Sequence, residues 1–245
     1  MMKKQVVITG ANGGIGSALC KAYFDHDFEV VALDKQTGSA HDYVHKYVSV
    51  DSDLYASSEQ YRNSVNLKLK SFNPSILINN AAVQLLNDFG YFEDQDWVST
   101  MNVNLHSCYF FIQAFYASLS LNIGQVINIG SIHASQTKPR FFAYATSKSA
   151  LVGLTKSLAV EFKGKITVNA ISPAAIGTDM LKAGFDNDKT ALDKLAEIHP
   201  SQQIGDPKLL ASFILSLTTA DNRFLNGSNI SYDGGISNAL LDLDY

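Results

Sequence analysis

The segment Tyr144-Ala145-Thr146-Ser147-Lys148 spaces a tyrosine and a lysine for proton transfer. Residues i and i+4 lie on one face of a helix, so the phenol and the ammonium can face the same space. A free tyrosine, with a pKa of about 10, is a poor acid or base near neutrality, and a nearby ammonium favours its phenolate. Ser131, thirteen residues earlier, puts a hydroxyl within reach of the tyrosine and the lysine. The pattern predicts a proton-transferring tyrosine, but Y-x-x-x-K alone is common on surface helices and needs context.

A glycine-rich turn supplies part of that context. Thr9-Gly10-Ala11-Asn12-Gly13-Gly14-Ile15-Gly16 connects the first apolar run to an amphipathic segment. Glycines allow positive φ and close backbone approach, and the N–H groups of a new helix attract a pyrophosphate. The spacing is G-x-x-x-G-x-G rather than G-x-G-x-x-G, because Leu19 stands where a third glycine would be. The turn predicts a dinucleotide cradle formed by Gly10, Asn12, Gly13, Gly14, Ile15 and Gly16.

Asp34 indicates which dinucleotide is preferred. It ends the second apolar run, eighteen residues after Gly16. A carboxylate there can accept both hydroxyls of the adenosine ribose and repels the extra phosphate of NADP. Neighbouring Lys35 keeps NADP(H) open as the alternative, because a lysine can pair with a phosphate. We expect NAD(H) to be preferred.

The hydrophobic pattern predicts an α/β fold with a mostly parallel sheet. Short apolar runs alternate with longer amphipathic segments, and the runs are continuous, which is typical of strands buried on both faces. The fold class is therefore a Rossmann-type, doubly wound, seven-stranded sheet with helices on both faces. No linker interrupts the series, so residues 1–245 are expected to form one domain. The runs are 6–8, 30–33, 47–50, 76–78, 126–129, 166–171 and 230–232, and the helices are expected at 15–24, 54–69, 97–121, 144–162 and 209–217.

Residues 179–203 differ from the rest of the chain. The stretch is longer than an ordinary βα connection, is rich in small and charged residues, and has room for one short helix. A long loop beside the strand ends is a candidate substrate-binding lid.

Six motifs together resemble one known family. T-G-A-N-G-G-I-G, N-N-A-A at 79–82, Asn104, I-N-I-G-S ending at Ser131, Y-A-T-S-K, and N-A-I-S-P-A-A-I-G-T at 169–178 occur in the order and spacing of the short-chain dehydrogenase/reductase family. The similarity runs from Thr9 to Gly235, and the chain has the length of the family's single-domain form. The resemblance implies an oxidoreductase that transfers a hydride between NAD(H) and a secondary alcohol or ketone.

The resemblance also implies four catalytic roles. Tyr144 would donate a proton to the substrate oxygen in reduction and accept one in oxidation. Ser131 would hydrogen-bond that oxygen. Lys148 would lower the tyrosine pKa and bind the nicotinamide ribose, and Asn104 would hold a water that links Lys148 to a proton relay.

Further cofactor contacts are implied by the same resemblance. Asp51 would meet the adenine amino group, and Thr178 would lie toward the phosphates. Ala174 stands where the family usually has glycine, so its methyl group is expected to alter the loop near the nicotinamide. The cofactor-binding set outside the glycine turn is Asp34, Asp51, Asn80, Ala81, Ala82, Tyr144, Lys148, Pro173, Ala174, Ile176 and Thr178.

The sequence leaves the substrate open. We expect the pocket wall to include Gln84, His133, Phe141 and Ala175, with the stretch 180–199 above it. A sugar, polyol, hydroxy acid or cyclic alcohol would suit this mixed wall almost equally. One alternative function is an NADPH-dependent 3-oxoacyl thioester reductase, against which Asp34 argues. Another is a non-catalytic dinucleotide sensor or scaffold, which would typically lack the tyrosine or the lysine.

Composition limits the partners and the surroundings. The net charge of −4 over 245 residues is spread along the chain, and no basic stripe favours nucleic acid. No apolar run reaches the roughly 18 residues of a membrane span, and the N-terminal apolar run is too short for a secretion signal, so we expect a cytoplasmic protein.

Cysteines and histidines do not form a recognisable metal pattern. Cys20 and Cys108 are far apart without a CxxC, so neither a disulfide nor a thiolate metal site is expected. His41 and His45 share i, i+4 spacing but have no third ligand beside them. We expect no metal.

The aromatic run around residues 109–116 is apolar over more of the helix than one core face requires. The resemblance implies that this helix and the one bearing Tyr144 form a subunit interface, in a homotetramer or a homodimer.

Overall fold

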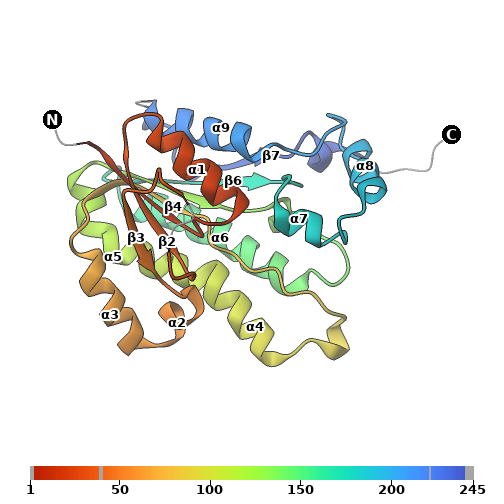
Figure 1. Cartoon of the computed structure of the whole chain (residues 1–245), viewed down its shortest axis with the longest axis horizontal. Coiled ribbons are helices and arrows are strands. Elements are labelled where there is room, and N and C mark those ends of the chain that lie inside the picture. Colours follow the sequence, from red (N-terminus) through yellow and green to blue (C-terminus); the bar gives the residue numbers. More distant parts are fainter. Residues whose placement is uncertain (1–2, 39–40, 221, 241–245) are drawn as a thin grey trace.

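The computed structural model describes residues 3–38, 41–220 and 222–240, and Figure 1 shows a central sheet between two layers of helices. All six strand pairs are parallel, and the strand order is β3-β2-β1-β4-β5-β6-β7. The predicted Rossmann-type fold is confirmed. The strands are β1 (Gln5–Thr9), β2 (Glu29–Asp34), β3 (Lys46–Ser49), β4 (Pro74–Asn79), β5 (Gln125–Ile129), β6 (Thr167–Pro173) and β7 (Asn229–Tyr232).

Burial on both faces explains the continuous apolar strands. Successive side chains of a strand point to opposite faces, so in β1 Val6 and Ile8 join one core and Val7 joins the other. The first core packs against α1 (Gly14–Phe24) and α9 (Pro207–Thr219). The second packs against α3 (Glu59–Leu69), α5 (Ser107–Leu121) and α6 (Phe142–Glu161). These two sets of helices lie on opposite sides of the sheet in Figure 1.

The helix expected over 54–69 is two helices, α2 (Ser52–Ser57) and α3. Ser58 between them is extended, and its hydroxyl accepts a hydrogen bond from the Tyr61 N–H at 3.2 Å. A serine that caps the start of a second helix also ends the first, because its own backbone leaves the helical conformation.

The helix expected over 97–121 has a wider turn inside it. It begins as α4 (Asp94–Met101), passes through a π-helical turn (Asn102–His106) and continues as α5. Such turns insert an extra residue and occur often at functional sites. This one carries Asn104.

The segment 179–203 contains two short helices where one was expected, α7 (Asp179–Ala183) and α8 (Lys189–Glu197). Neither has a buried residue. The chain also forms 3-10 turns at Phe89–Tyr91, Ile132–Ala134 and Ile236–Asn238.

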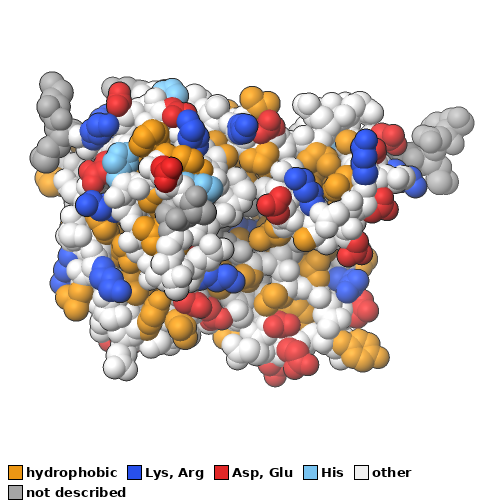
Figure 2. Space-filling view, in the orientation of Figure 1, with side chains coloured by type: hydrophobic (Ala, Val, Ile, Leu, Met, Phe, Trp, Pro, Cys, Tyr) orange, Lys and Arg blue, Asp and Glu red, His pale blue; other side chains and the backbone are white. Residues whose placement is uncertain are grey.

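The surface in Figure 2 mixes charges of both signs on the visible face, in agreement with a net charge of −4. No helix of the described residues is long and apolar enough to cross a membrane.

Candidate active site

The predicted site residues gather at one edge of the sheet, where the parallel strands end. The glycine turn follows β1, Asp34 ends β2, Asn80 follows β4 and Ser131 follows β5. Strand order reverses between β1 and β4, because the chain builds β2 and β3 on one side of β1 and β4 to β7 on the other. Ligands of open α/β sheets bind in the crevice at such a point.

The glycine turn fits a pyrophosphate. Gly10 has φ of +63°, and a Cβ there would lie 2.8 Å from the Ala81 Cα. A Cβ on Gly14 would lie 2.7 Å from the Thr178 side chain. Helix α1 begins after Gly13 without a side-chain cap and without an acidic residue in its first turn. Its first N–H groups are therefore available to an anion.

The segment after β4 is fastened to this turn by a residue that the sequence analysis did not single out. The Thr9 hydroxyl accepts hydrogen bonds from the Asn80 and Ala81 N–H groups at 2.9 and 3.0 Å. The Asn80 amide donates to the carbonyls of Thr9 and Gly10 at 3.0 Å. The amide of Asn79 instead donates to Asn128 across the sheet at 2.8 Å. Thr9 thus holds two predicted cofactor-binding segments together.

Asp34 and Asp51 both accept backbone hydrogen bonds. The Asp34 carboxylate accepts from the N–H groups of Asn12 at 2.9 Å and Gln36 at 3.3 Å. Asp51 caps α2, because one of its oxygens accepts from the N–H groups of Asp53 and Leu54. Each of these four bonds uses one lone pair, so both carboxylates keep acceptor capacity for a ligand.

The segment after β6 bends at the unusual alanine without positive φ. Ala174 donates its N–H to the Tyr232 carbonyl at 3.2 Å, and it is not among the residues with positive φ. Glycine is therefore not needed here for a positive φ, and the effect of the methyl group near the nicotinamide stays a prediction. Ile176 is buried, and Thr178 caps α7 by accepting from the Leu181 N–H.

Helix α6 brings Tyr144 and Lys148 together as the i, i+4 spacing predicts. The Lys148 Nζ lies 5.6 Å from the centroid of the Tyr144 ring and donates to the Ile129 carbonyl at 2.7 Å. Lys148 is 2% exposed. Burial lowers its pKa to about 8, against a smaller opposing effect of Cys108.

The pKa of Tyr144 reflects two opposing effects. Burial raises it, and a hydrogen bond with the Ser131 side chain lowers it in part. The cost of moving the phenolate out of water exceeds the stabilisation by Ser131, so the net shift of the Tyr144 pKa is upward, and the contribution of Lys148 stays a prediction.

Ser131 is held in place by its neighbours. It is buried and extended, and its Oγ accepts from the His133 N–H at 3.2 Å. The His133 ring stacks on Phe141 at 4.4 Å and meets Tyr144 edge-on at 5.8 Å. Burial, and then the Lys138 charge, lowers the pKa of His133 to about 4, so its ring is neutral at physiological pH.

Asn104 is fully buried and braces two segments. Its side chain accepts from the Val83 N–H at 2.8 Å and donates to the Val83 carbonyl at 2.9 Å. It also donates to the Ser147 Oγ at 3.0 Å, and that hydroxyl donates to the Tyr144 carbonyl at 2.7 Å. Asn104 thus connects the segment after β4 to the helix of Tyr144, and Ser147 was not predicted from the sequence.

The other predicted wall residues lie on neighbouring segments. Gln84 is exposed after β4, and the Ala175 carbonyl accepts from the Gly205 N–H at 2.9 Å. A cavity of about 580 Å³ lies between the segment 133–137 and α6, lined by residues that include His133, Phe142 and Thr146.

The described residues contain no group of three or more His, Cys, Asp or Glu that could hold a metal. The His45 Nδ1 accepts a hydrogen bond from the Val30 N–H at 3.1 Å, so the lone pair of this nitrogen is already used within the fold. Cys20 and Cys108 are free and buried.

Known proteins resemble this chain over nearly its whole length. It is 28% identical over 240 residues to the 3-oxoacyl-(acyl-carrier-protein) reductase FabG of Vibrio harveyi, covering 95% of this chain and 97% of the relative. A solved 4-hydroxyisoleucine dehydrogenase complexed with NADH is 30% identical with a TM-score of 0.87, covering 97% of this chain and 100% of that one. ElxO with NADP bound is 28% identical with a TM-score of 0.85 and the same coverage.

A model of the family described as short chain dehydrogenase matches residues 4–189, well over half of the chain. The match includes the glycine turn, Ser131, Tyr144 and Lys148, whose side chains the fold brings to one edge of the sheet. The chain therefore belongs to the short-chain dehydrogenase family and is an oxidoreductase.

Proposed function

We propose that the protein is a dehydrogenase or reductase that interconverts a secondary alcohol and a ketone with NAD(H), and that Tyr144 is its general acid and base. One observation carries this proposal. The half-buried phenol of Tyr144 lies near the buried Ser131 side chain, which lowers its pKa in part, and the buried Lys148 ammonium lies one helical turn away, 5.6 Å from the Tyr144 ring centroid. A weak acid, a hydroxyl and a cation are the groups that proton transfer to a carbonyl oxygen needs.

The proton is exchanged between the substrate oxygen and the Tyr144 phenol. In oxidation, the alcohol lies with its oxygen between Ser131 and Tyr144, and the phenolate takes the hydroxyl proton as hydride leaves the carbon. In reduction, Tyr144 returns that proton to the oxygen as hydride arrives. Bound NAD(H) supplies the hydride or accepts it. The Lys148 ammonium, fixed by the Ile129 carbonyl, favours the phenolate through its charge.

Asn104 acts at a distance from the substrate. Its contacts with Val83 and Ser147 set the position of α6 against the segment after β4. We propose that it positions Tyr144 and Lys148 relative to the bound cofactor. Its link to Lys148 through a bound water stays a prediction.

The residues that would hold the cofactor lie along the same edge. The glycine turn and the N-terminus of α1 would hold the pyrophosphate, and Asp34 would bind the adenosine ribose. Asp51 and the segment 80–82 would line the adenine side. Residues 173–178 would contact the nicotinamide; Thr178 of this segment is close to Gly14.

Preference for NAD(H) rests on Asp34. One solved relative holds NADH and another holds NADP, so relatives alone do not choose between the two. A carboxylate at the end of β2 accepts hydrogen bonds from the ribose hydroxyls and repels a 2′-phosphate. Lys35, next in the chain, is exposed and is the residue that would favour NADP(H).

For the substrate we propose a polar alcohol or ketone that contacts Gln84, His133, Phe141 and Ala175. His133 stays neutral near pH 7, so it would act as an uncharged hydrogen-bond partner beside the reacting carbon. The similarity to FabG supports a 3-oxoacyl thioester as the second candidate. Retention of both Tyr144 and Lys148 argues against a non-catalytic sensor.

A panel assay tests the function. Sugars, polyols, hydroxy acids, cyclic alcohols and acetoacetyl thioesters would be offered with each coenzyme while nicotinamide absorbance is followed. We expect turnover with higher kcat/KM for NAD(H) than for NADP(H). A clear advantage of NADP(H) together with thioester turnover would select the second candidate.

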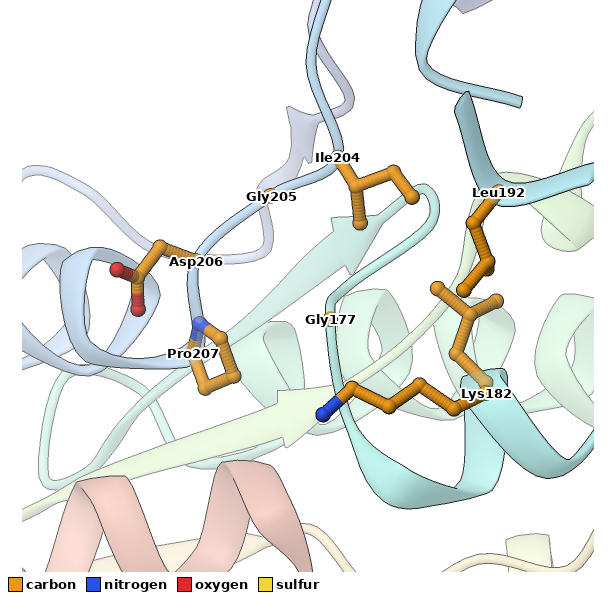
Figure 3. Close-up of a pocket in the computed structure, with 8 residues that line it drawn as sticks. Gly177, Lys182, Leu192, Ile204, Gly205, Asp206 and Pro207 are labelled. Atoms are coloured by element: carbon orange, nitrogen blue, oxygen red, sulfur yellow. The ribbon is translucent and has the colours of Figure 1, made fainter. Parts of the chain in front are cut away.

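We propose that residues 179–203 form a lid over this site. Figure 3 shows Lys182 and Leu192 facing the segment 204–207 across a cavity of about 380 Å³. The Asp206 carboxylate is directed to α9, where it accepts from the Lys208 N–H. The cavity and the absence of buried residues in α7 and α8 leave this segment room to move.

We also propose a homotetramer, or else a homodimer, that works in the cytoplasm. Tyr109 and Tyr116 on α5 and Val160 on α6 are 42%, 40% and 78% exposed, which is apolar surface available to a second copy. Light scattering should give four or two times the 26.7 kDa chain mass, and a monomer would exclude the assembly.

A further inference from the structure

Residues 36–38, which follow β2, lie against the glycine turn and are held there by Asn12. The Asn12 side-chain amide donates to the Gln36 Oε1 at 3.1 Å and to the Gly38 carbonyl at 3.0 Å. It also lies 3.3 Å from the Tyr47 hydroxyl, to which it donates. The Tyr47 hydroxyl in turn donates to the Gln36 carbonyl at 2.8 Å. We call these four hydrogen bonds the Asn12 clamp.

The clamp shares its residues with Asp34. The backbone N–H of Asn12 donates to one oxygen of the Asp34 carboxylate and that of Gln36 donates to the other. The backbone N–H groups of Asn12 and Gln36 therefore orient the Asp34 carboxylate. The Asn12 side chain, together with the side chain and carbonyl of Gln36, holds residues 36–38 in place. Moving residues 36–38 would disturb both sets of contacts.

Tyr47 is suited to remain a neutral donor. Burial and the charge of Asp34 raise its pKa, while its hydrogen bond with Asn12 lowers it in part. Its hydroxyl therefore keeps its proton near neutral pH and continues to hold the Gln36 carbonyl.

We propose that the Asn12 clamp determines coenzyme specificity by holding residues 36–38 against the ribose-binding face of Asp34. This inference rests on the proposed use of a nicotinamide coenzyme. A 2′-hydroxyl needs only a lone pair of Asp34, whereas a 2′-phosphate needs space and counter-charge beside it. Residues 36–38 occupy the neighbourhood of the carboxylate, so a 2′-phosphate can enter only if the four bonds of the clamp open. Charge repulsion by Asp34 and steric exclusion by the clamp then act together.

Direct titration of NADH and NADPH tests the proposal without a substrate. Tyr47→Phe removes the hydroxyl that joins Asn12 to Gln36 and keeps the ring. We expect the ratio of the NADPH to the NADH dissociation constant to fall about tenfold, through weaker NADH binding and unchanged or tighter NADPH binding. Asn12→Ala removes the other donor group and should lower the ratio at least as much.

Tyr43→Phe is the matched control. Its hydroxyl comes from the chain between β2 and β3 and bonds the Ser17 Oγ at 2.8 Å, but the bond runs to α1 rather than to residues 36–38. The ratio should change less than about twofold. Circular dichroism and thermal melting would show that all three variants are folded.

The outcomes separate the two proposals. Wild-type preference for NADPH would overturn the proposed preference for NAD(H), whatever the variants do. An unchanged ratio in both Tyr47→Phe and Asn12→Ala, or an equal fall in Tyr43→Phe, would overturn the clamp. A fall confined to the two clamp variants would support it, whichever coenzyme the wild type prefers.

Discussion

The two ends of the candidate cofactor site are built on different physical principles. At the proton-transfer end, Lys148 is almost fully buried and its pKa falls to about 8, while burial raises the pKa of Tyr144. At the adenosine end, Asp34 is half-buried and is oriented by two backbone N–H groups. Exclusion of water sets the chemistry at one end, and hydrogen-bond geometry sets recognition at the other.

This difference separates what mutations should do. A change at the proton-transfer end alters which protonation states are populated, so it should affect turnover, pH dependence and stability. A change at the adenosine end alters which coenzyme fits, so it should affect affinity ratios and leave the chemical step intact.

Removing the phenol hydroxyl should have the largest effect. Tyr144→Phe keeps the ring and its packing on His133 but leaves no group to exchange a proton with the substrate oxygen. We expect kcat to fall by roughly 10³-fold or more, because general acid–base catalysis contributes about 10²–10⁴-fold. The dissociation constant of NADH should change little.

Tyr91→Phe is a suitable control, since this tyrosine is 76% exposed in the 3-10 turn Phe89–Tyr91 and lies outside the proposed subunit interface. It should keep wild-type turnover. If Tyr144→Phe retained a tenth of the activity, another group would have to move the proton and the assigned role would be wrong.

Neutralising Lys148 should change stability in a pH-dependent way. The folded protein releases the Lys148 proton near pH 8, and the unfolded chain releases it near 10.5. Between these values the unfolded state binds more protons, so the free energy of unfolding rises with pH, by at most about 1.4 kcal/mol per pH unit. Below pH 8 the full cost of the buried charge is present.

Lys148→Met should therefore be more stable than the wild type near pH 7, by about 1–2 kcal/mol after loss of the hydrogen bond to Ile129. Denaturant melts should show this advantage shrinking from pH 8 to pH 10. Lys156→Met, at an exposed position of the same helix, serves as the control and should show no such trend. A pH-independent difference for Lys148→Met would mean that the ammonium is well solvated.

Sequence patterns predicted the elements whose signals are local. Tyr144 and Lys148 meet because helical periodicity alone places them on one face, and the strands are recognisable because both sheet faces are buried. Features that depend on distant segments were missed. The π-helical turn at Asn104 and the hydrogen bond between Tyr47 and Gln36 arise only when separate elements pack.

The net direction of the Tyr144 pKa shift could not be predicted from the sequence for a related reason. The spacing shows that an ammonium is near, but only the packed structure shows how far both groups are removed from water. Desolvation is a property of the whole fold, whereas a charge pair can be recognised from a motif.

The smallest predicted effect concerns Ala174, which follows β6 at a position that resembles a family glycine. Its backbone does not need positive φ, and its N–H is bonded to Tyr232, so Ala174→Gly relieves no strain. The change should lower the free energy of unfolding by about 0.5–1 kcal/mol, because glycine gains more freedom in the unfolded chain. NADH affinity should stay within about twofold of the wild type.

Gly10 provides the contrast to Ala174, because at φ +63° a Cβ would lie 2.8 Å from the Ala81 Cα. Gly10→Ala should therefore weaken NADH binding far more than Ala174→Gly changes it. If Ala174→Gly instead tightened NADH binding about tenfold, the methyl group would be obstructing the nicotinamide, and the segment after β6 would have to be counted as a third element of coenzyme recognition. With no such gain, glycine is required on this edge where backbones approach each other closely, at the turn after β1, and alanine suffices after β6, where the backbone does not need positive φ.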